Sequence, residues 1–206
     1  MEFLRTANAG GLLKMDGISI LLDGVCGMVE PYEQTTEAML EYLTNNFPDA
    51  VGFTHRHPDH FLGSFVCDYE NKTDRQALVA ADTTLLVEKV KIHSFVSRHL
   101  GRAEEGLKHS SFLIEGSKRV LFTGDAAPTA IKGIEADVLI APYAYANSPA
   151  GLKAAAATGA KYMILVHMPA CKNDAYGIWD SVQTTLSGQT EINVLIPELG
   201  QNINID

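Results

Sequence analysis

Three histidines and one aspartate lie within six residues that read HRHPDH, in a chain with only seven histidines. Neutral imidazoles and carboxylates are ligands for zinc and other divalent first-row metals. If the apolar strand before this stretch continues through it, alternation places His55 and His57 on one face. The proline would then turn Asp59 and His60 back over the same pocket. We predict a metal site here rather than a solvated polar loop, because buried polar groups need partners.

Three further side chains that can bind metals end strand-like segments. They are His99 at the end of residues 90–99, Asp125 at the end of residues 118–125, and His167 at the end of residues 161–167. The carboxyl edge of the strands in an open α/β sheet often holds ligands. A strand-end aspartate is often only a turn residue or a helix cap, so the prediction rests on the three together. His93, in mid-strand, is interpreted as packed or hydrogen-bonded, and Tyr143 and Tyr145 as surface aromatics.

Hydrophobic periodicity and turn residues predict the elements that would position these side chains. Hairpins are expected at residues 10–24, around Asp16-Gly17, and at residues 110–125. Further strands are expected at residues 49–55, 77–82, 85–99, 136–143, 161–167, 193–197 and 201–205, and helices within residues 33–48, 61–69, 151–159 and 176–186. This order predicts an α/β fold of two packed sheets with helices outside. A length of 206 residues fits a single domain over residues 1–206.

Composition limits the class of protein. A formal net charge of −9 argues against binding along nucleic-acid phosphates, so a small-molecule substrate is expected. Cys26, Cys67 and Cys171 are scattered and form no C-x-x-C pair, which fits a reducing compartment better than a disulfide framework. Neither a signal-peptide pattern nor a run of about 18 apolar residues is found, so we expect a cytoplasmic protein without a membrane partner. A homodimer is expected as the commonest assembly.

The candidate residues resemble the sequence pattern of the metallo-β-lactamase superfamily of metal-dependent hydrolases. The matching parts are, in order, the N-terminal hairpin ending at Asp23-Gly24, the motif His55-x-His57-x-Asp59-His60, a histidine before a hairpin, Gly124-Asp125, and the strand-end His167. The match spans nearly the whole chain. It implies a four-layer αββα sandwich of the metallo-β-lactamase type, with the metal site at the edge between the two sheets.

The resemblance also implies a set of ligands for two divalent metal ions, with zinc favoured and manganese or iron as alternatives. By position, the first ion would be bound by His55, His57 and His99, and the second by Asp59, His60 and His167, with Asp125 as the bridge. His109 is the alternative third histidine, because it also precedes a strand. If His99 is the third histidine, His109 would support the ligands or face the substrate. Asp59, or a leaving-group water, would handle the proton in catalysis.

The implied activity is hydrolysis of a small ester, phosphodiester, lactone or thioester by a hydroxide that the metals activate at neutral pH. Asp125 stands where true β-lactamases of the superfamily commonly have cysteine. The span from His57 to His99 leaves no room for the arm of tRNA-processing members, so the chain is similar to the compact hydrolase branch. Two alternatives remain open: an iron-dependent redox enzyme similar to persulfide dioxygenases, and a metal-binding sensor without turnover.

Overall fold

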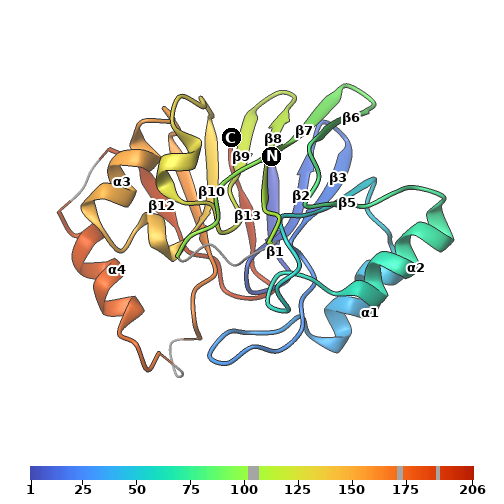
Figure 1. The fold of residues 1–206 in the computed structure, drawn as a ribbon, viewed down its shortest axis with the longest axis horizontal. Coiled ribbons are helices and arrows are strands. Elements are labelled where there is room, and N and C mark those ends of the chain that lie inside the picture. Colours follow the sequence, from blue (N-terminus) through green and yellow to red (C-terminus); the bar gives the residue numbers. More distant parts are fainter. Residues whose placement is uncertain (102–106, 171–173, 189–190) are drawn as a thin grey trace.

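A computed structural model describes residues 1–101, 107–170, 174–188 and 191–206, which form two mixed β-sheets that pack together (Figure 1). In order across the first sheet lie β13 (Asn202–Asn204), β1 (Glu2–Arg5), β2 (Gly11–Met15), β3 (Ile18–Leu22), β4 (Ala50–Phe53) and β5 (Leu78–Val79). In order across the second lie β12 (Asn193–Leu195), β11 (Tyr162–Val166), β10 (Val138–Pro142), β9 (Arg119–Phe122), β8 (Ser110–Glu115), β7 (Val90–Val96) and β6 (Thr83–Val87).

Each sheet begins with antiparallel hairpins and continues with parallel strands. β1, β2 and β3 pair antiparallel, whereas β3, β4 and β5 are parallel. Likewise β6 to β9 are antiparallel and β9 to β12 are parallel. The predicted hairpin around Asp16 and Gly17 is confirmed, and both residues have the positive φ that such a turn requires. Parallel strands place their carboxyl ends at one edge, so the residues that follow β3, β4, β9 and β11 can meet there.

Helices cover the outer face of each sheet, as Figure 1 shows. α1 (Glu37–Asn45) and α2 (Gly63–Thr73) pack on the first sheet, and α3 (Pro149–Ala156) and α4 (Ile178–Leu186) on the second. The short 3-10 helices η1 (Pro128–Ile131) and η2 (Tyr143–Tyr145) flank β10. The layers therefore follow the order helix, sheet, sheet, helix, and the predicted four-layer αββα sandwich is confirmed.

An apolar core fills the space between the two sheets. Phe3 and Ile20 from the first sheet and Phe112, Phe122 and Ile164 from the second are at most 1% exposed. Full burial of such a side chain contributes about 1.5–3 kcal/mol. The packed sheets therefore provide a rigid support for the loops at their edge.

Capping side chains explain where two of the helices begin. The Thr36 hydroxyl accepts a hydrogen bond from the Met39 N–H at 3.2 Å at the start of α1. The Ser148 hydroxyl accepts one from the Gly151 N–H at 3.1 Å, and Pro149 occupies the first turn. α3 therefore begins before the predicted start at residue 151.

β4 is shorter than predicted, and this changes how the first two histidines are positioned. The strand expected at residues 49–55 ends at Phe53, and it does not continue through His57. The reason is a contact with a residue remote in sequence, because the Thr54 N–H donates to Oδ1 of Asp23 at 2.7 Å rather than to a neighbouring strand. A loop, and not strand alternation, therefore brings His55 and His57 together.

The segment predicted as one strand, residues 85–99, is divided. β6 and β7 form a hairpin that turns at Glu88, whose φ is 52°. β7 ends at Val96, so His99 does not end a strand as predicted and instead forms an isolated bridge with Ala126. The interpretation of His93 as hydrogen-bonded is confirmed, since its Nδ1 lies 3.0 Å from the Thr84 hydroxyl.

Two features bear on the class of protein. Within the described ranges, no helix has both the length and the apolar character needed to cross a membrane. Cys26 and Cys67 are free thiols, the first buried and the second exposed, whereas Cys171 lies outside the described residues.

Candidate metal centre

The predicted ligands lie on loops that follow strands of both sheets. His55, His57, Asp59 and His60 follow β4, His99 follows β7, Asp125 follows β9, and His167 follows β11. In the described part of the chain, three groups of side chains have potential ligand atoms within 4.8 Å of one another: His55 with His57 and His99, Asp59 with His60 and His167, and Asp23 with His55 and His60. The first two groups are the two ligand sets that the resemblance implies.

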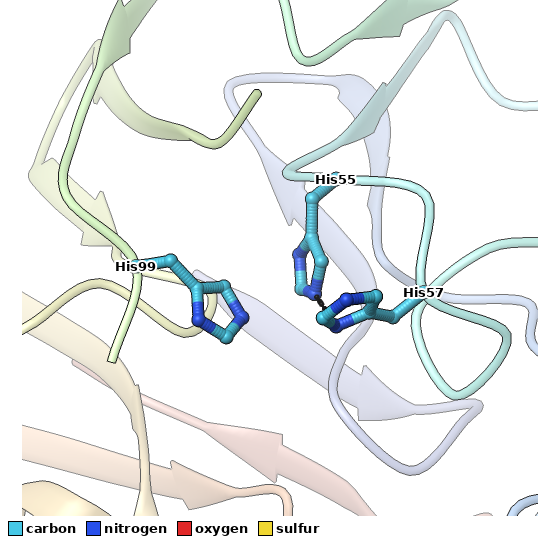
Figure 2. A group of neighbouring side chains, drawn as sticks. All are labelled: His55, His57 and His99. Atoms are coloured by element: carbon cyan, nitrogen blue, oxygen red, sulfur yellow. Dashed lines mark hydrogen bonds between the residues drawn. The ribbon is translucent and has the colours of Figure 1, made fainter. Parts of the chain in front are cut away.

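His55, His57 and His99 form the first group (Figure 2). Nε2 of His55 lies 2.9 Å from Nδ1 of His57. The ring centroid of His99 lies 4.9 Å from that of His55 and 5.2 Å from that of His57. Figure 2 shows the three rings directed toward one another, His55 and His57 from one loop and His99 from a separate segment. Imidazole nitrogens that converge in this way fit three histidine ligands on one metal ion.

Asp59, His60 and His167 form the second group. Oδ2 of Asp59 lies 3.1 Å from Nε2 of His167 and 3.9 Å from Nε2 of His60. His167 has a left-handed backbone with φ 57°, which costs a residue with a Cβ about 1–2 kcal/mol. Its backbone N–H donates to the Asn8 carbonyl at 2.9 Å. The surroundings therefore hold the ring of His167 beside Asp59 against a local backbone preference.

Asp125 lies between the two groups. Its Oδ2 is 3.3 Å from Nε2 of His60, 3.6 Å from Nε2 of His167 and 3.7 Å from Nε2 of His99. Burial alone would raise the pKa of Asp125, but the charges of His167 and His60 outweigh it and hold that pKa well below its usual range. An ionised carboxylate in contact with both groups fits a bridging ligand.

The carboxylates of the site stabilise positive charge at His60, whereas burial lowers the pKa of His55 and His109. Burial would lower the pKa of His60, but Asp125 and Asp23 raise it well above its usual value. Burial would likewise raise the pKa of Asp59, but the hydrogen bond of His167 and the charge of His60 lower it. Carboxylates that draw protons onto neighbouring imidazoles draw divalent cations to the same place, and a bound metal replaces those protons.

Asp23 is fully buried behind the site. Its hydrogen bonds determine which ring nitrogen of His55 and of His60 is directed into the centre. Its Oδ2 accepts from Nδ1 of His60 at 2.8 Å and from the Thr54 hydroxyl at 2.6 Å. Because Thr54 gives its proton to Asp23, its oxygen accepts from Nδ1 of His55 at 2.9 Å. Nε2 of both histidines is then directed into the centre. The group of Asp23, His55 and His60 is therefore a hydrogen-bonded support and not a separate ion site.

Unpaired buried nitrogens test whether a metal fits this centre. Nε2 of His60, His99 and His109 is buried and makes no hydrogen bond within the described residues. Unsatisfied buried polar atoms cost about 1–3 kcal/mol each, so a cluster of three needs an explanation. A cation bound by these lone pairs and by the neighbouring carboxylates satisfies all of them, and the residues present therefore fit a metal.

His109 is held from behind by two hydroxyl groups. Ser111 donates to the Thr123 carbonyl at 2.9 Å, so its oxygen accepts from Ser97 at 2.8 Å. Ser97 in turn accepts a hydrogen bond from Nδ1 of His109 at 2.8 Å. Nδ1 therefore carries the ring proton, and Nε2 has a free lone pair. Burial lowers the pKa of His109 to about 3, so the ring is neutral, and its centroid lies 5.1 Å from that of His55. Nε2 of His109 can therefore accept a hydrogen bond or bind a metal.

His99 has a similar arrangement at a more exposed position. Its Nδ1 donates to the Leu100 carbonyl at 2.6 Å, which leaves Nε2 free to bind a metal, and its side chain is 18% exposed. The ligand atoms of His99 lie within 4.8 Å of those of both His55 and His57, and no group with these two histidines includes His109. The distances favour His99 as third ligand, with His109 beside it.

A pair of alanine variants distinguishes the roles of His99 and His109. We expect His99→Ala to lower bound zinc by about one ion per chain, because it removes one of three ligands. We expect His109→Ala to keep both ions with an affinity reduced by about 10–100-fold, as is typical of a residue that supports ligands. Elemental analysis and zinc titration measure both, and His93→Ala is the matched control on β7. Zinc lost from His109→Ala and kept by His99→Ala would assign the third ligand to His109.

Asp23, Thr54 and Tyr32 shape this site but are not among the predicted site residues. Asp23 marks the end of a hairpin in the sequence, yet an aspartate directly after an apolar strand is the same signal that identifies Asp125. Thr54 and Tyr32 carry no sequence signal. The ring of Tyr32 nevertheless meets that of His167 edge-on at 4.3 Å between centroids.

The two tyrosines that follow β10 differ from their interpretation as surface aromatics. Tyr145 is fully buried, and its hydroxyl donates to the Ala126 carbonyl at 3.0 Å, so that interpretation is wrong. Tyr143 is half-buried, and its ring centroid lies 6.1 Å from that of His167. Tyr145 therefore fastens the loop after Asp125, while Tyr143 borders the second ligand group.

No protein-family model matches the chain, and no curated protein matches its sequence. Solved structures do resemble it. An isothiocyanate hydrolase from Delia radicum gut bacteria superposes with a TM-score of 0.69 at 15% identity, over 100% of this chain and 99% of that one. The metallo-beta-lactamase fold protein YhfI from Bacillus subtilis superposes with a TM-score of 0.65 at 17% identity, over 98% of this chain and 97% of that one.

A third structure has a different named activity. CmlA, a diiron beta-hydroxylase from Streptomyces venezuelae, superposes with a TM-score of 0.61 at 12% identity. The match covers 99% of this chain and 53% of CmlA, so this chain spans about half of that protein. At such low identities these likenesses establish the fold and leave the reaction to be argued from the site.

Proposed function

Because the chain has the metallo-β-lactamase fold, we propose that it is a metal-dependent hydrolase of a small ester, phosphodiester, lactone or thioester. The observation that carries the proposal is the position of Asp125. Its Oδ2 lies within 3.7 Å of nitrogens of His60, His167 and His99, which come from both ligand groups. A carboxylate placed in this way supports two ions that share one ligand.

The donor set supports zinc as the first choice, with manganese or iron as alternatives. It contains imidazoles and carboxylates, which suit these metals, whereas neither Cys26 nor Cys67 belongs to a ligand group. We assign one ion to His55, His57 and His99, the other to Asp59, His60 and His167, and the bridge to Asp125. When bound, such ions supply a water of lowered pKa and polarise an oxygen of the substrate.

Asp59 is the catalytic residue of this proposal. Its side chain is 14% exposed, the hydrogen bond with Nε2 of His167 orients it, and its lowered pKa keeps it ionised at neutral pH. It can therefore accept a proton from the attacking water and return it to the leaving group. Asp23 acts behind it by orienting His60, and by orienting His55 through Thr54.

Iron-dependent redox chemistry is the second candidate, because the fold of a diiron hydroxylase covers 99% of this chain. The isothiocyanate hydrolase is matched over 99% of its own length, whereas CmlA is matched over 53%. A metal-binding sensor without turnover is the third candidate.

Metal reconstitution followed by a substrate panel tests the proposal. Protein stripped with a chelator should hydrolyse none of a set of generic carboxylic esters, thioesters, lactones and phosphodiesters. Zn²⁺ or Mn²⁺ should restore hydrolysis of at least one class, because the metals supply the nucleophile. Oxygen uptake with Fe²⁺ and no hydrolysis would favour the redox candidate. Zinc occupancy without turnover of any substrate in the panel would contradict hydrolysis and favour the sensor.

A further inference from the structure

Two tyrosines from separate loops border His167. The ring of Tyr32, from the connection between β3 and α1, meets that of His167 at 4.3 Å between centroids and an interplanar angle of 80°. The ring of Tyr143, from η2, lies 6.1 Å away at 63°. Neither residue belongs to the ligand groups, and each carries a hydroxyl group that the proposed reaction does not yet use.

Both tyrosine rings lie beside His167, on the side of the centre where the second ligand group lies. Burial, together with the neighbouring Tyr143, Asp125 and Asp59, raises the pKa of Tyr32, so its hydroxyl keeps its proton at neutral pH. Each tyrosine hydroxyl has a single proton that it can donate. The pair therefore offers two hydrogen-bond donors from separate loops beside the second ligand group.

The loop that carries Tyr32 is fastened at several points. The Gly27 N–H donates to the Pro58 carbonyl at 2.7 Å, which ties this loop to the one with the HRHPDH motif. Next to Tyr32, Oε2 of Glu33 lies 3.4 Å from Nη2 of the buried Arg5. Anchors on both sides of Tyr32 hold its position before any ligand arrives, and a donor held in this way loses little entropy on binding.

We propose that the Tyr32–Tyr143 pair binds a negatively charged oxygen of a ligand held at the second ligand group, as a carboxylate, phosphate or tetrahedral oxyanion would present. The proposal rests on the proposed metal centre, because two divalent cations outweigh the charges of Asp59 and Asp125, whereas the bare carboxylates would repel an oxyanion. With the cations present, a neutral O–H donor adds a hydrogen bond that strengthens as negative charge develops on the oxygen.

Calorimetric titration of the zinc-loaded protein with inorganic phosphate tests this pair without requiring turnover. Tyr32→Phe and Tyr143→Phe should each weaken phosphate binding about tenfold, the effect of one hydrogen bond to a charged group. The double variant should lose about 100-fold, because each hydroxyl donates its own hydrogen bond. Tyr42→Phe on α1, where the tyrosine is 43% exposed, is the matched control and should bind as the wild type does.

Each other outcome of the titration overturns the inference. Phosphate binding by Tyr32→Phe at wild-type affinity would show that no donor acts there, and the absence of phosphate binding by the wild type would do the same. Zinc lost from Tyr32→Phe would mean that the hydroxyl supports the metal ligands rather than a bound anion. Failure of the substrate panel together with a tenfold loss in phosphate affinity would instead contradict hydrolysis and leave the tyrosine pair standing.

Discussion

Asp125→Ala should lower bound zinc by at least one ion per chain and lower hydrolysis by about 1,000-fold or more. Asp125 is the residue that contacts both ligand groups, through His60 and His99 among others. Removal of the Asp125 carboxylate would leave each of the two proposed ions with one ligand fewer. It also leaves the imidazoles of both groups facing one another without the intervening negative charge. Since loss of a residue that only orients a ligand already weakens metal binding by about 10–100-fold, loss of a ligand should exceed that range.

Metal content per chain and the rate on the best substrate of the panel measure this effect. Asp68→Ala is the matched control, because Asp68 is an exposed aspartate of α2 that contacts Lys72 at 3.3 Å, and such surface pairs contribute little. It should keep both zinc ions and the full rate. An Asp125→Ala protein that binds two ions as tightly as the wild type would exclude the bridging role.

Asp23→Ala should lower the stability of the metal-free protein by about 3–5 kcal/mol, the cost of removing one partner from a buried charged or hydrogen-bonded set. The carboxylate accepts from the Thr54 N–H at 2.7 Å, from the Thr54 hydroxyl at 2.6 Å and from Nδ1 of His60 at 2.8 Å. All three donors are buried, and alanine would leave them without an acceptor. The carboxyl end of β4 depends on the same contact, so the HRHPDH loop should loosen as well.

Urea unfolding of chelator-treated protein measures this loss, with Asp68→Ala again as control. The milder Asp23→Asn keeps the shape but presents an NH2 group to donors, so His60 loses the acceptor that fixes its ring. We expect zinc affinity in Asp23→Asn to fall about 10–100-fold even where the protein folds normally. Unchanged unfolding of Asp23→Ala, or unchanged zinc affinity of Asp23→Asn, would mean that Asp23 does not support the ligands.

Local sequence signals account for most of the strands and helices. Asp16-Gly17 identifies the first hairpin, and the apolar runs that follow give the parallel strands β4, β10 and β11. The turn at Glu88 carries no glycine, asparagine or proline, so residues 85–99 were expected to form one strand. The end of β4 depends on Asp23, which is remote in sequence from Thr54. No local pattern reports such a contact.

For the site, too, local sequence signals predict some features, whereas contacts between remote residues determine the others. The spacing of HRHPDH and the strand-end Asp125 and His167 predict the metal-ligating residues, because residue type and position at a strand end are local properties. The choice between His99 and His109 depends on distances between loops, and the hydrophobic periodicity of a sequence gives no information about such distances. Tyr32 depends on how its loop is fastened to Pro58. A small-molecule substrate, the absence of a nucleic-acid partner and a homodimer stay predictions.

The central claim is a centre for two metal ions, and the number of ions per chain tests it most directly. Protein made without added metal, stripped with a chelator and titrated with Zn²⁺, should bind two ions per chain, with elemental analysis after dialysis giving the same number. Metal affinity should fall in Asp125→Ala and remain unchanged in Asp68→Ala. A folded wild-type protein that retains one zinc ion or none per chain at saturating Zn²⁺ would contradict the account.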